Sequence, residues 1–145
     1  MNAEEKNPLT EYDAAVAYAS ACNRHDPTEF IELLAPNATY TSFLAREPLK
    51  GKEVIAGYIS GIMKNQGNIG MELKAEVAWV FEDIQYLKLA LDEGSGSHMR
   101  DCVLLKQDGD KDHDRLAIFG VEEYLITIID ILFPYSGKLC YAIRK

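Results

Sequence analysis

Two tyrosines and several acidic residues have the chemistry to hold or protonate a small molecule. Tyr18 recurs with Ala15 and Cys22 at helical spacing, so its phenol is expected to point into the core. A phenol there could donate a hydrogen bond to a substrate carbonyl and stabilise an enolate as negative charge develops. The other interpretation is a core tyrosine whose hydroxyl bonds to backbone or water. The sequence leaves both open.

Tyr40 lies in a stretch rich in Thr and Tyr, over residues 38–43, that predicts a short strand. Ser42 follows two residues later and so shares the face of Tyr40. A serine hydroxyl cannot act as a base at neutral pH without an activating partner, so we expect Ser42 to contact a substrate only. Tyr58 and Trp79 are further expected contacts, and Trp79 either lines the cavity or forms a dimer surface.

Asp101 is a candidate proton donor on a predicted strand. If it shares a face with Met99, Val103 and Leu105, it is buried and its pKa should rise, because desolvation disfavours the charged form. Otherwise it pairs with Arg100 or with solvent.

Asp26 and His98 have two interpretations each. Asp26 precedes Pro27 and Glu29 in the pattern of a helix capping box, with a substrate contact as its second role. His98 is either a proton carrier at a strand edge or a solvated loop histidine.

No metal or cofactor is expected. The alternating acidic residues from Asp108 to Asp114 resemble a calcium loop, but His113 stands where an EF-hand needs glycine. Cys22, Cys102 and Cys140 lack metal-ligand spacing and are expected to be reduced thiols. There is also no Gly-rich phosphate loop.

The elements that would position these residues change type along the chain. Apolar residues at helical spacing predict helices over residues 11–23, 27–35 and 52–64, the first capped by Thr10. Strict alternation predicts a long strand over residues 69–81. Further strands are expected over residues 84–91, 99–106 and 116–126, joined by hairpin loops. Helices followed by a strand meander indicate an α+β fold, with a curved antiparallel sheet wrapped around a helix to leave a ligand-holding cone.

Composition excludes several function classes. The chain has 145 residues, 48% of them hydrophobic, and a net charge of -8, as expected for one globular domain over residues 1–145. No run of Lys and Arg could bind nucleic acid or an anionic membrane. With no apolar segment for a signal peptide or a membrane span, a cytoplasmic protein is expected.

Three motifs carry a resemblance to a known superfamily. They are Tyr18-x3-Cys22-Asn23-x-His25-Asp26, then Leu33-Leu34-Ala35-Pro36-Asn37-Ala38-Thr39-Tyr40, then Leu49-x-Gly51-Lys52-Glu53-x-Ile55-x3-Ile59. Over about the first 65 residues the chain resembles the NTF2-like superfamily, within it the SnoaL-like and ketosteroid-isomerase-like group. The remainder is similar by strand pattern alone.

The resemblance implies roles for particular residues. Tyr18 precedes Asp26 by the spacing of the oxyanion-hole tyrosine in ketosteroid isomerases, and Asp101 lies on the strand of their second oxyanion donor. Ser42 stands where those enzymes carry their aspartate base, which argues against ordinary steroid isomerisation. Tyr40 resembles the strand tyrosine of scytalone dehydratase, but the pair of histidines that enzyme needs inside the cone is missing here.

Two functions remain from the sequence. The first is a SnoaL-like isomerase, dehydratase or cyclase that acts by proton transfer on a hydrophobic carbonyl compound, with Tyr18, Tyr40 and Asp101 as catalytic residues. The second is a non-catalytic homodimeric domain that binds a hydrophobic small molecule in the same cone. The apolar run over residues 126–133 is expected to cover the cone mouth or to pack in the dimer interface.

Overall fold

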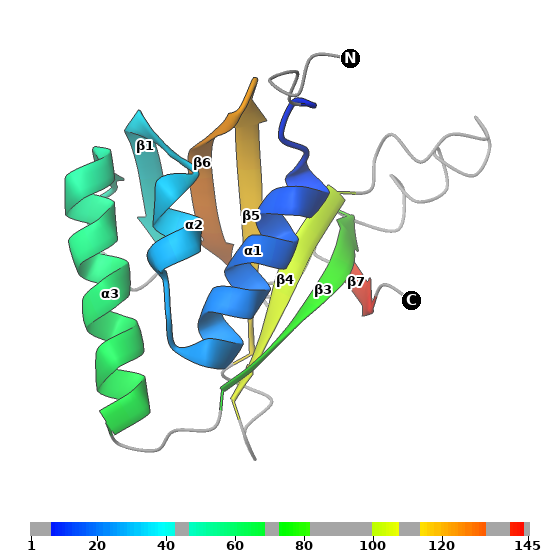
Figure 1. Cartoon of the computed structure of the whole chain (residues 1–145). Helices are drawn as coiled ribbons and strands as arrows, with labels where there is room; N and C mark the ends of the chain where they lie inside the picture. The colour runs from blue at the N-terminus through cyan, green and yellow to red at the C-terminus, as the bar shows by residue number, and fades with distance from the viewer. Residues whose placement is uncertain are drawn as a thin grey trace.

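The structure is a computed structural model that describes residues 7–42, 47–68, 73–81, 100–107, 114–132 and 140–143. Three helices and seven strands occur in this part of the chain (Figure 1). In chain order they are α1 (Glu11–Arg24), α2 (Thr28–Glu32), β1 (Leu34–Ser42), β2 (Leu49–Lys50), α3 (Lys52–Asn68), β3 (Leu73–Phe81), β4 (Arg100–Gln107), β5 (Arg115–Glu122), β6 (Leu125–Leu132) and β7 (Cys140–Ile143).

The strands form one sheet in the order β2-β1-β6-β5-β4-β3-β7, with the helices packed on one of its faces (Figure 1). This arrangement confirms the expected α+β fold. The sheet is mixed, however, because β1 and β6 run parallel while the other neighbouring pairs are antiparallel. We call the face under the helices the inner face and the opposite one the outer face.

Helix α1 begins where the sequence predicts, and a capping box fixes its start. The hydroxyl of Thr10 accepts a hydrogen bond from the Asp13 N–H (3.0 Å), and the Asp13 carboxylate accepts one from the Thr10 N–H (3.1 Å). The helix ends at His25, which adopts a left-handed conformation with φ of 53°.

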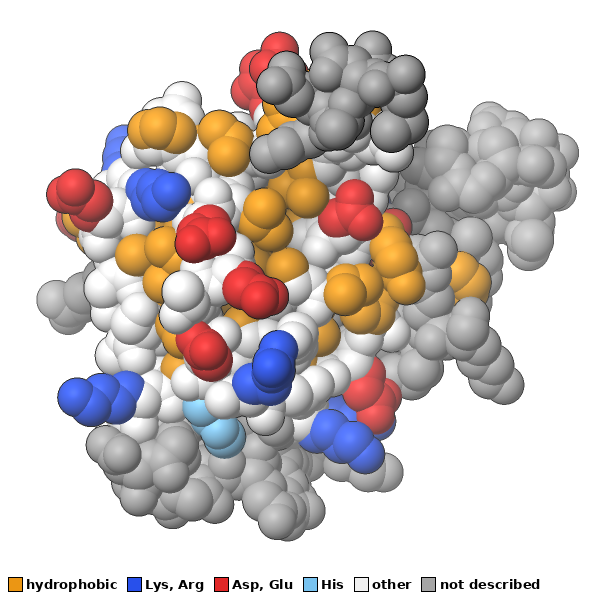
Figure 2. All heavy atoms as spheres, in the orientation of Figure 1, with side chains coloured by type: hydrophobic (Ala, Val, Ile, Leu, Met, Phe, Trp, Pro, Cys, Tyr) orange, Lys and Arg blue, Asp and Glu red, His pale blue; other side chains and the backbone are white. Residues whose placement is uncertain are grey.

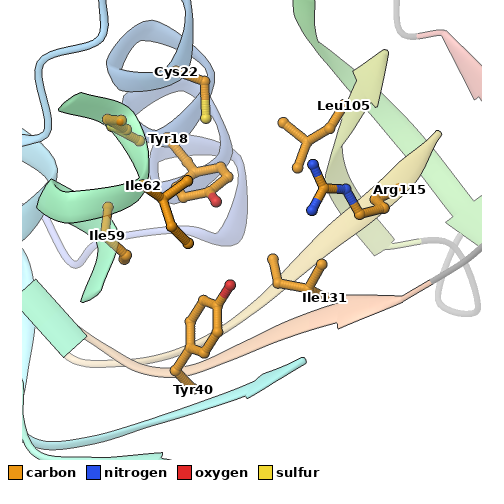
Figure 3. A pocket seen from close by; sticks show the side chains of 9 residues that line it. Tyr18, Cys22, Tyr40, Ile59, Ile62, Leu105, Arg115 and Ile131 are labelled. Atoms are coloured by element: carbon orange, nitrogen blue, oxygen red, sulfur yellow. The ribbon is translucent and has the colours of Figure 1, made fainter. Parts of the chain in front are cut away.

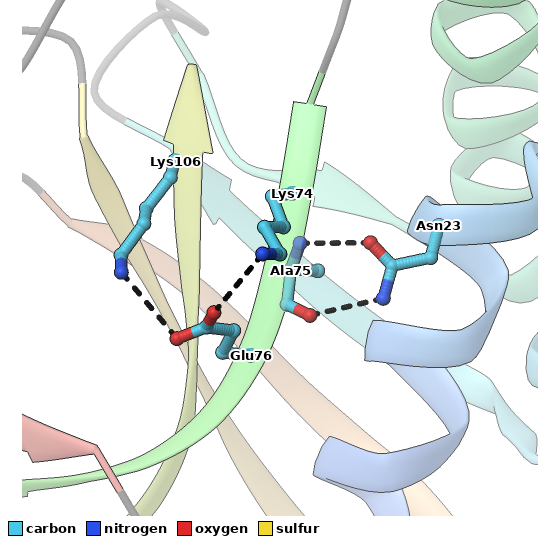
Figure 4. A network of polar contacts seen from close by, with 5 residues as sticks. All are labelled: Asn23, Lys74, Ala75, Glu76 and Lys106. Carbon is cyan, nitrogen blue, oxygen red and sulfur yellow. Dashed lines mark hydrogen bonds and ion pairs between the residues drawn. The ribbon is translucent and has the colours of Figure 1, made fainter. Parts of the chain in front are cut away.

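The side chain of Asn23 attaches the end of α1 to strand β3. It accepts a hydrogen bond from the N–H of Ala75 (2.8 Å) and donates one to the carbonyl of the same residue (2.9 Å), as Figure 4 shows. On the other side of β3, Glu76 forms ion pairs with Lys74 and Lys106.

Helix α2 is shorter than expected, because the helix predicted over residues 27–35 stops at Glu32 and β1 starts at Leu34. Tertiary pairing explains the difference. The carbonyl of Leu33 accepts a hydrogen bond from the N–H of Ile126 in β6 (2.7 Å), and Pro36 disfavours helical backbone just before it. Between Leu34 and Thr39, the register of β1 against β6 shifts.

The expected strand over residues 116–126 is wrong, because it is two strands, β5 and β6, joined by a turn at Glu123 and Tyr124. The apolar run that was expected over residues 126–133 to cover the cone mouth or to pack in a dimer interface belongs, as far as Leu132, to β6 in the middle of the sheet. Ile126, Ile129 and Ile131 are buried in the core, and Ile128 is 45% exposed. A homodimer stays a prediction, and so does a place for this run in its interface.

The other expected elements agree within the described part of the chain. Helix α3 and strands β3 and β4 lie at or near their predicted positions. The strand predicted over residues 84–91 lies outside the described residues, as do residues 69–72 of the long strand.

Buried apolar side chains occupy both faces of the sheet. The larger cluster lies between the inner face and the helices and includes Phe30, Ile55 and Phe119. A smaller cluster on the outer face includes Val80, Cys102 and Leu104. In Figure 2, which views the helical side, acidic, basic and apolar side chains are interspersed, and the described residues of this side form no continuous basic patch.

Candidate functional site

Helix α1 places Tyr18 and Cys22 one turn apart on its buried side. The Tyr18 ring packs edge-on against Phe30 and Phe119, with centroids 4.9 and 5.4 Å away. Burial, followed by the neighbouring Cys22, raises the pKa of Tyr18 well above its ordinary value. Burial likewise raises the pKa of the Cys22 thiol to about 12. Both groups are therefore protonated at neutral pH, and a hydrogen bond joins them.

Strand β1 supplies Tyr40 and Ser42, which share the inner face as predicted and are both buried. Burial, followed by the nearby Tyr58, raises the pKa of Tyr40 to about 12, while a hydrogen bond from Ser42 acts in the opposite direction. The Tyr58 ring on α3 packs against the Tyr40 ring with centroids 5.4 Å apart. Tyr40 is thus a neutral phenol supported by two of the residues expected beside it.

A pocket opens between α1, α3 and the inner face of the sheet (Figure 3). The hydroxyls of Tyr18 and Tyr40 point into it from opposite sides. Its volume is about 30 Å³, which is room for about two water molecules. The described residues that line it are Tyr18, Cys22, Tyr40, Ile59, Ile62, Met63, Leu105, Arg115 and Ile131.

Arg115 is the functional candidate that the sequence analysis missed. It begins β5, where alternation puts it on the same inner face as Ala117 and Phe119, both of which are buried in the core. Its guanidinium points into the pocket in Figure 3. The alternation of β5 could have identified it, but the strand predicted from the sequence began at residue 116 and left Arg115 outside it.

Asp101 and Trp79 lie opposite each other on β4 and β3 and do not line this pocket. Alternation puts Asp101 on the inner face with Val103 and Leu105, the first of the two alternatives left by the sequence. Its side chain is half-buried, and it has an interaction partner, so no catalytic role follows from its position.

Asp26 is exposed at the turn between α1 and α2, away from the pocket-lining residues. Its carboxylate accepts hydrogen bonds from the side chain (2.7 Å) and the N–H (3.1 Å) of Thr28, and these bonds lower its pKa. Asp26 thus bonds to the first turn of α2, but the predicted capping box is not formed, because Pro27 is the N-cap and the Asp26 N–H donates to the Ala21 carbonyl. His98 lies outside the described residues.

The site offers hydrogen-bond donors and one positive charge. Of the described residues that line the pocket, none is a carboxylate or a histidine. Elsewhere in the described part of the chain, no three His, Cys, Asp or Glu side chains are grouped to hold a metal ion. None of the helices described is long and apolar enough to cross a membrane.

The fold recurs in solved structures of several small proteins. A SnoaL-like protein of unknown function from Burkholderia thailandensis is 16% identical, with a TM-score of 0.55 over 87% of this chain and 98% of its own. An NTF2-like protein of unknown function from Cytophaga hutchinsonii is 18% identical, with a TM-score of 0.53 over 90% and 96%. A protein with a ketosteroid isomerase-like fold from Catenulispora acidiphila, solved with trimethylamine, is 15% identical, with a TM-score of 0.53 over 90% and 91%.

These likenesses show that the chain has the NTF2-like fold, so the resemblance expected from the sequence is confirmed at the level of the fold. No protein-family model matches the chain, and no curated protein matches it in sequence. Because one such fold hosts many unrelated activities, function has to be argued from the pocket itself.

Proposed function

We propose that this protein binds a small, mostly apolar molecule with an oxygen acceptor, such as a carbonyl, in the pocket between α1, α3 and the sheet. The phenol of Tyr40 donates a hydrogen bond to that oxygen, while the Tyr18 phenol, which is hydrogen-bonded to Cys22, forms the opposite wall. The observation that carries the proposal is the position of the Tyr40 hydroxyl, which is buried, neutral and directed into the pocket.

The contacts of Tyr40 leave its proton for a ligand. Its oxygen accepts the hydrogen bond from Ser42, so the O–H of Tyr40 is the donor that remains. A buried donor without a partner is costly, and a ligand oxygen in the pocket would satisfy it.

The walls of the pocket define the rest of the ligand. Ile59, Ile62 and Met63 come from α3, and Leu105 and Ile131 come from the sheet. These side chains favour an aliphatic tail through burial of apolar area. With a volume of about 30 Å³, the pocket admits the polar head of such a molecule, and the tail lies toward its open side.

Binding is better supported than proton abstraction. Tyr18, Cys22 and Tyr40 have raised pKa values, so none of them is a base at neutral pH. Since the other described lining residues are aliphatic side chains, methionine and arginine, the pocket can polarise a carbonyl but supplies no proton acceptor for isomerisation or dehydration.

Methyl NMR with methyl isobutyl ketone tests the proposal, because the isoleucine, leucine and methionine methyls of the pocket report binding directly. We expect titration to shift the methyls of Ile59, Ile62 and Ile131. In Tyr40→Phe the dissociation constant should rise about tenfold, the value of one hydrogen bond to a ligand.

Tyr124→Phe is the matched control, because Tyr124 lies exposed in the turn between β5 and β6. It removes the same hydroxyl and should leave the dissociation constant unchanged. Absence of pocket shifts, or equal affinity in Tyr40→Phe and the unmodified protein, would overturn the proposal.

A further inference from the structure

Arg115 is a cation in the pocket that has no ion pair with any described residue. Three other Lys and Arg side chains on the neighbouring strands β3 and β4 are paired. Arg100 contacts Glu11 at 3.1 Å, and Lys106 and Lys74 contact Glu76 at 3.4 and 3.9 Å. Asp114 adjoins Arg115 in the chain and is buried, yet the two form no ion pair within the described structure.

The other polar groups of the pocket do not neutralise this charge. Tyr18, Cys22 and Tyr40 each interact electrostatically with Arg115, but all three are protonated at neutral pH. The described residues Leu105 and Ile131 also lie beside the guanidinium in the pocket. Among the described residues, the neighbours of this half-buried cation are neutral or apolar, and charges taken out of water are normally paired.

We propose that the natural ligand is a small carboxylate, whose head group is held by Arg115 together with the phenol of Tyr40. This inference rests on the proposed function and names the class of the ligand. The planar guanidinium matches the two oxygens of a carboxylate, and hydrogen bonds between charged groups are stronger than those between neutral ones.

The dimensions and charge of the molecule support a small acid with an aliphatic tail. A volume of about 30 Å³ suits a carboxylate head, while the lining methyl groups suit the tail. The chain carries a net charge of -8 and would repel anions elsewhere, so a local cation at an apolar pocket is selective for this site.

The test compares isovalerate with isovaleramide, which share the isobutyl tail of methyl isobutyl ketone and differ from each other in charge. Pocket methyl shifts are followed by NMR at neutral pH and low salt. We expect isovalerate to bind about tenfold more tightly than isovaleramide. Added salt should reduce this preference.

Three variants test whether the charge of Arg115 causes the preference for isovalerate over isovaleramide. Arg115→Met removes the charge but keeps an aliphatic stem, and it should abolish the preference for the acid over the amide. Arg115→Lys should retain part of the preference. Lys106→Met is the matched control, because Lys106 points to the outer face on the adjacent strand, toward Glu76 (Figure 4). It removes the same charge and should keep the preference.

Equal binding of acid and amide would overturn this inference, as would a preference that survives in Arg115→Met or is lost equally in Lys106→Met. If the ketone still bound in a Tyr40-dependent manner, the proposed function would stand and only the carboxylate would be wrong. If none of the three compounds shifted the pocket methyls, both proposals would fail together.

Discussion

The amide side chain of Asn23 pairs with both backbone polar groups of Ala75, with hydrogen bonds of 2.8 and 2.9 Å. It does so on a stretch of β3 that, within the described residues, has a strand partner on one side only. Strand β4 pairs with β3 from Leu73 to Val80, whereas β7 pairs with it only from Ala78 onward. Asn23 therefore occupies the free edge of β3 in place of another strand and holds α1 in register with it.

Two substitutions of Asn23 distinguish the contributions that its two hydrogen bonds make to stability. Asn23→Ala loses both, and we expect a loss of about 1 to 2 kcal/mol in the free energy of unfolding, with faster hydrogen exchange at the Ala75 amide. Asn23→Asp keeps only the bond that it accepts. Because its charge also lies near the C-terminus of α1, it should not recover full stability. Urea denaturation measures these losses.

Asn37→Ala is the control for these variants, since Asn37 is exposed on β1. Its unfolding free energy should stay close to that of the unmodified protein. If Asn23→Ala were equally neutral, the contact with Ala75 would not hold α1 on the sheet.

Neighbouring isoleucines on β6 should respond very differently to truncation. Ile129 is fully buried against the inner cluster, while Ile128 is 45% exposed on the other side of the strand. We expect Ile129→Ala to cost about 2 to 5 kcal/mol and Ile128→Ala less than about 1 kcal/mol. Thermal or urea unfolding checks both, and similar costs would contradict the alternation described for β6.

The contribution of the capping box at the start of α1 to stability can be measured with two variants of Thr10. Thr10→Ala removes the acceptor for the Asp13 N–H and should cost about 1 kcal/mol. Thr10→Ser keeps a hydroxyl and should recover most of that loss. A Ser variant as unstable as the Ala variant would point to the threonine methyl group instead of the cap.

Stability should fall in alkaline solution because of buried weak acids. Burial raises the pKa of Cys22 from 9.0 to about 12 and that of Tyr40 from 10.0 to about 12. Between about pH 9 and 12 the unfolded chain ionises these groups and the folded protein does not. The free energy of unfolding is therefore unaffected below this window and decreases as the pH rises through it, by up to about 1.4 kcal/mol per pH unit for each group.

Urea unfolding across this pH range measures how steeply the free energy of unfolding falls with pH. Cys22→Ala should have a shallower dependence than the unmodified protein. Cys102→Ala offers a comparison in the outer cluster, because burial, followed by the charge of Asp101, raises the pKa of Cys102 to about 12 as well. If the free energy of unfolding fell equally steeply with pH in all three proteins, these thiols would ionise as readily in the folded protein as in the unfolded chain.

Much of the fold could be predicted because local patterns and tertiary packing agree. The helical spacing of Tyr18 and the alternation around Ala75 both place apolar residues on the buried side. The pattern failed at β6, where Ile126 to Leu132 shows little alternation because apolar residues lie on both faces of the strand, with Leu132 packed against the outer cluster. The preceding turn was also hidden, because Glu123 adopts a positive φ of 56° without a glycine.

The candidate site was predicted in part. Helix and strand periodicity identified Tyr18 and Tyr40, which the structure brings to one pocket. Arg115 was missed because the strand predicted from the sequence began at residue 116, and only the register of β5 reveals that it points inward. The sequence also could not decide the place of Asp101, since its face depends on pairing with residues far along the chain.

The parallel pairing of β1 with β6 has a consequence for the synthesis of the protein. Thr39 pairs early with Lys50 in β2, but its partner toward the middle of the sheet is Ile128, which is synthesised much later. On the ribosome, Phe30 and Ile55 emerge well before β5 and β6, the strands that complete the sheet over the inner cluster. The interval between the synthesis of α3 and that of β6 is therefore the time when the nascent chain is most prone to aggregate and most in need of a chaperone.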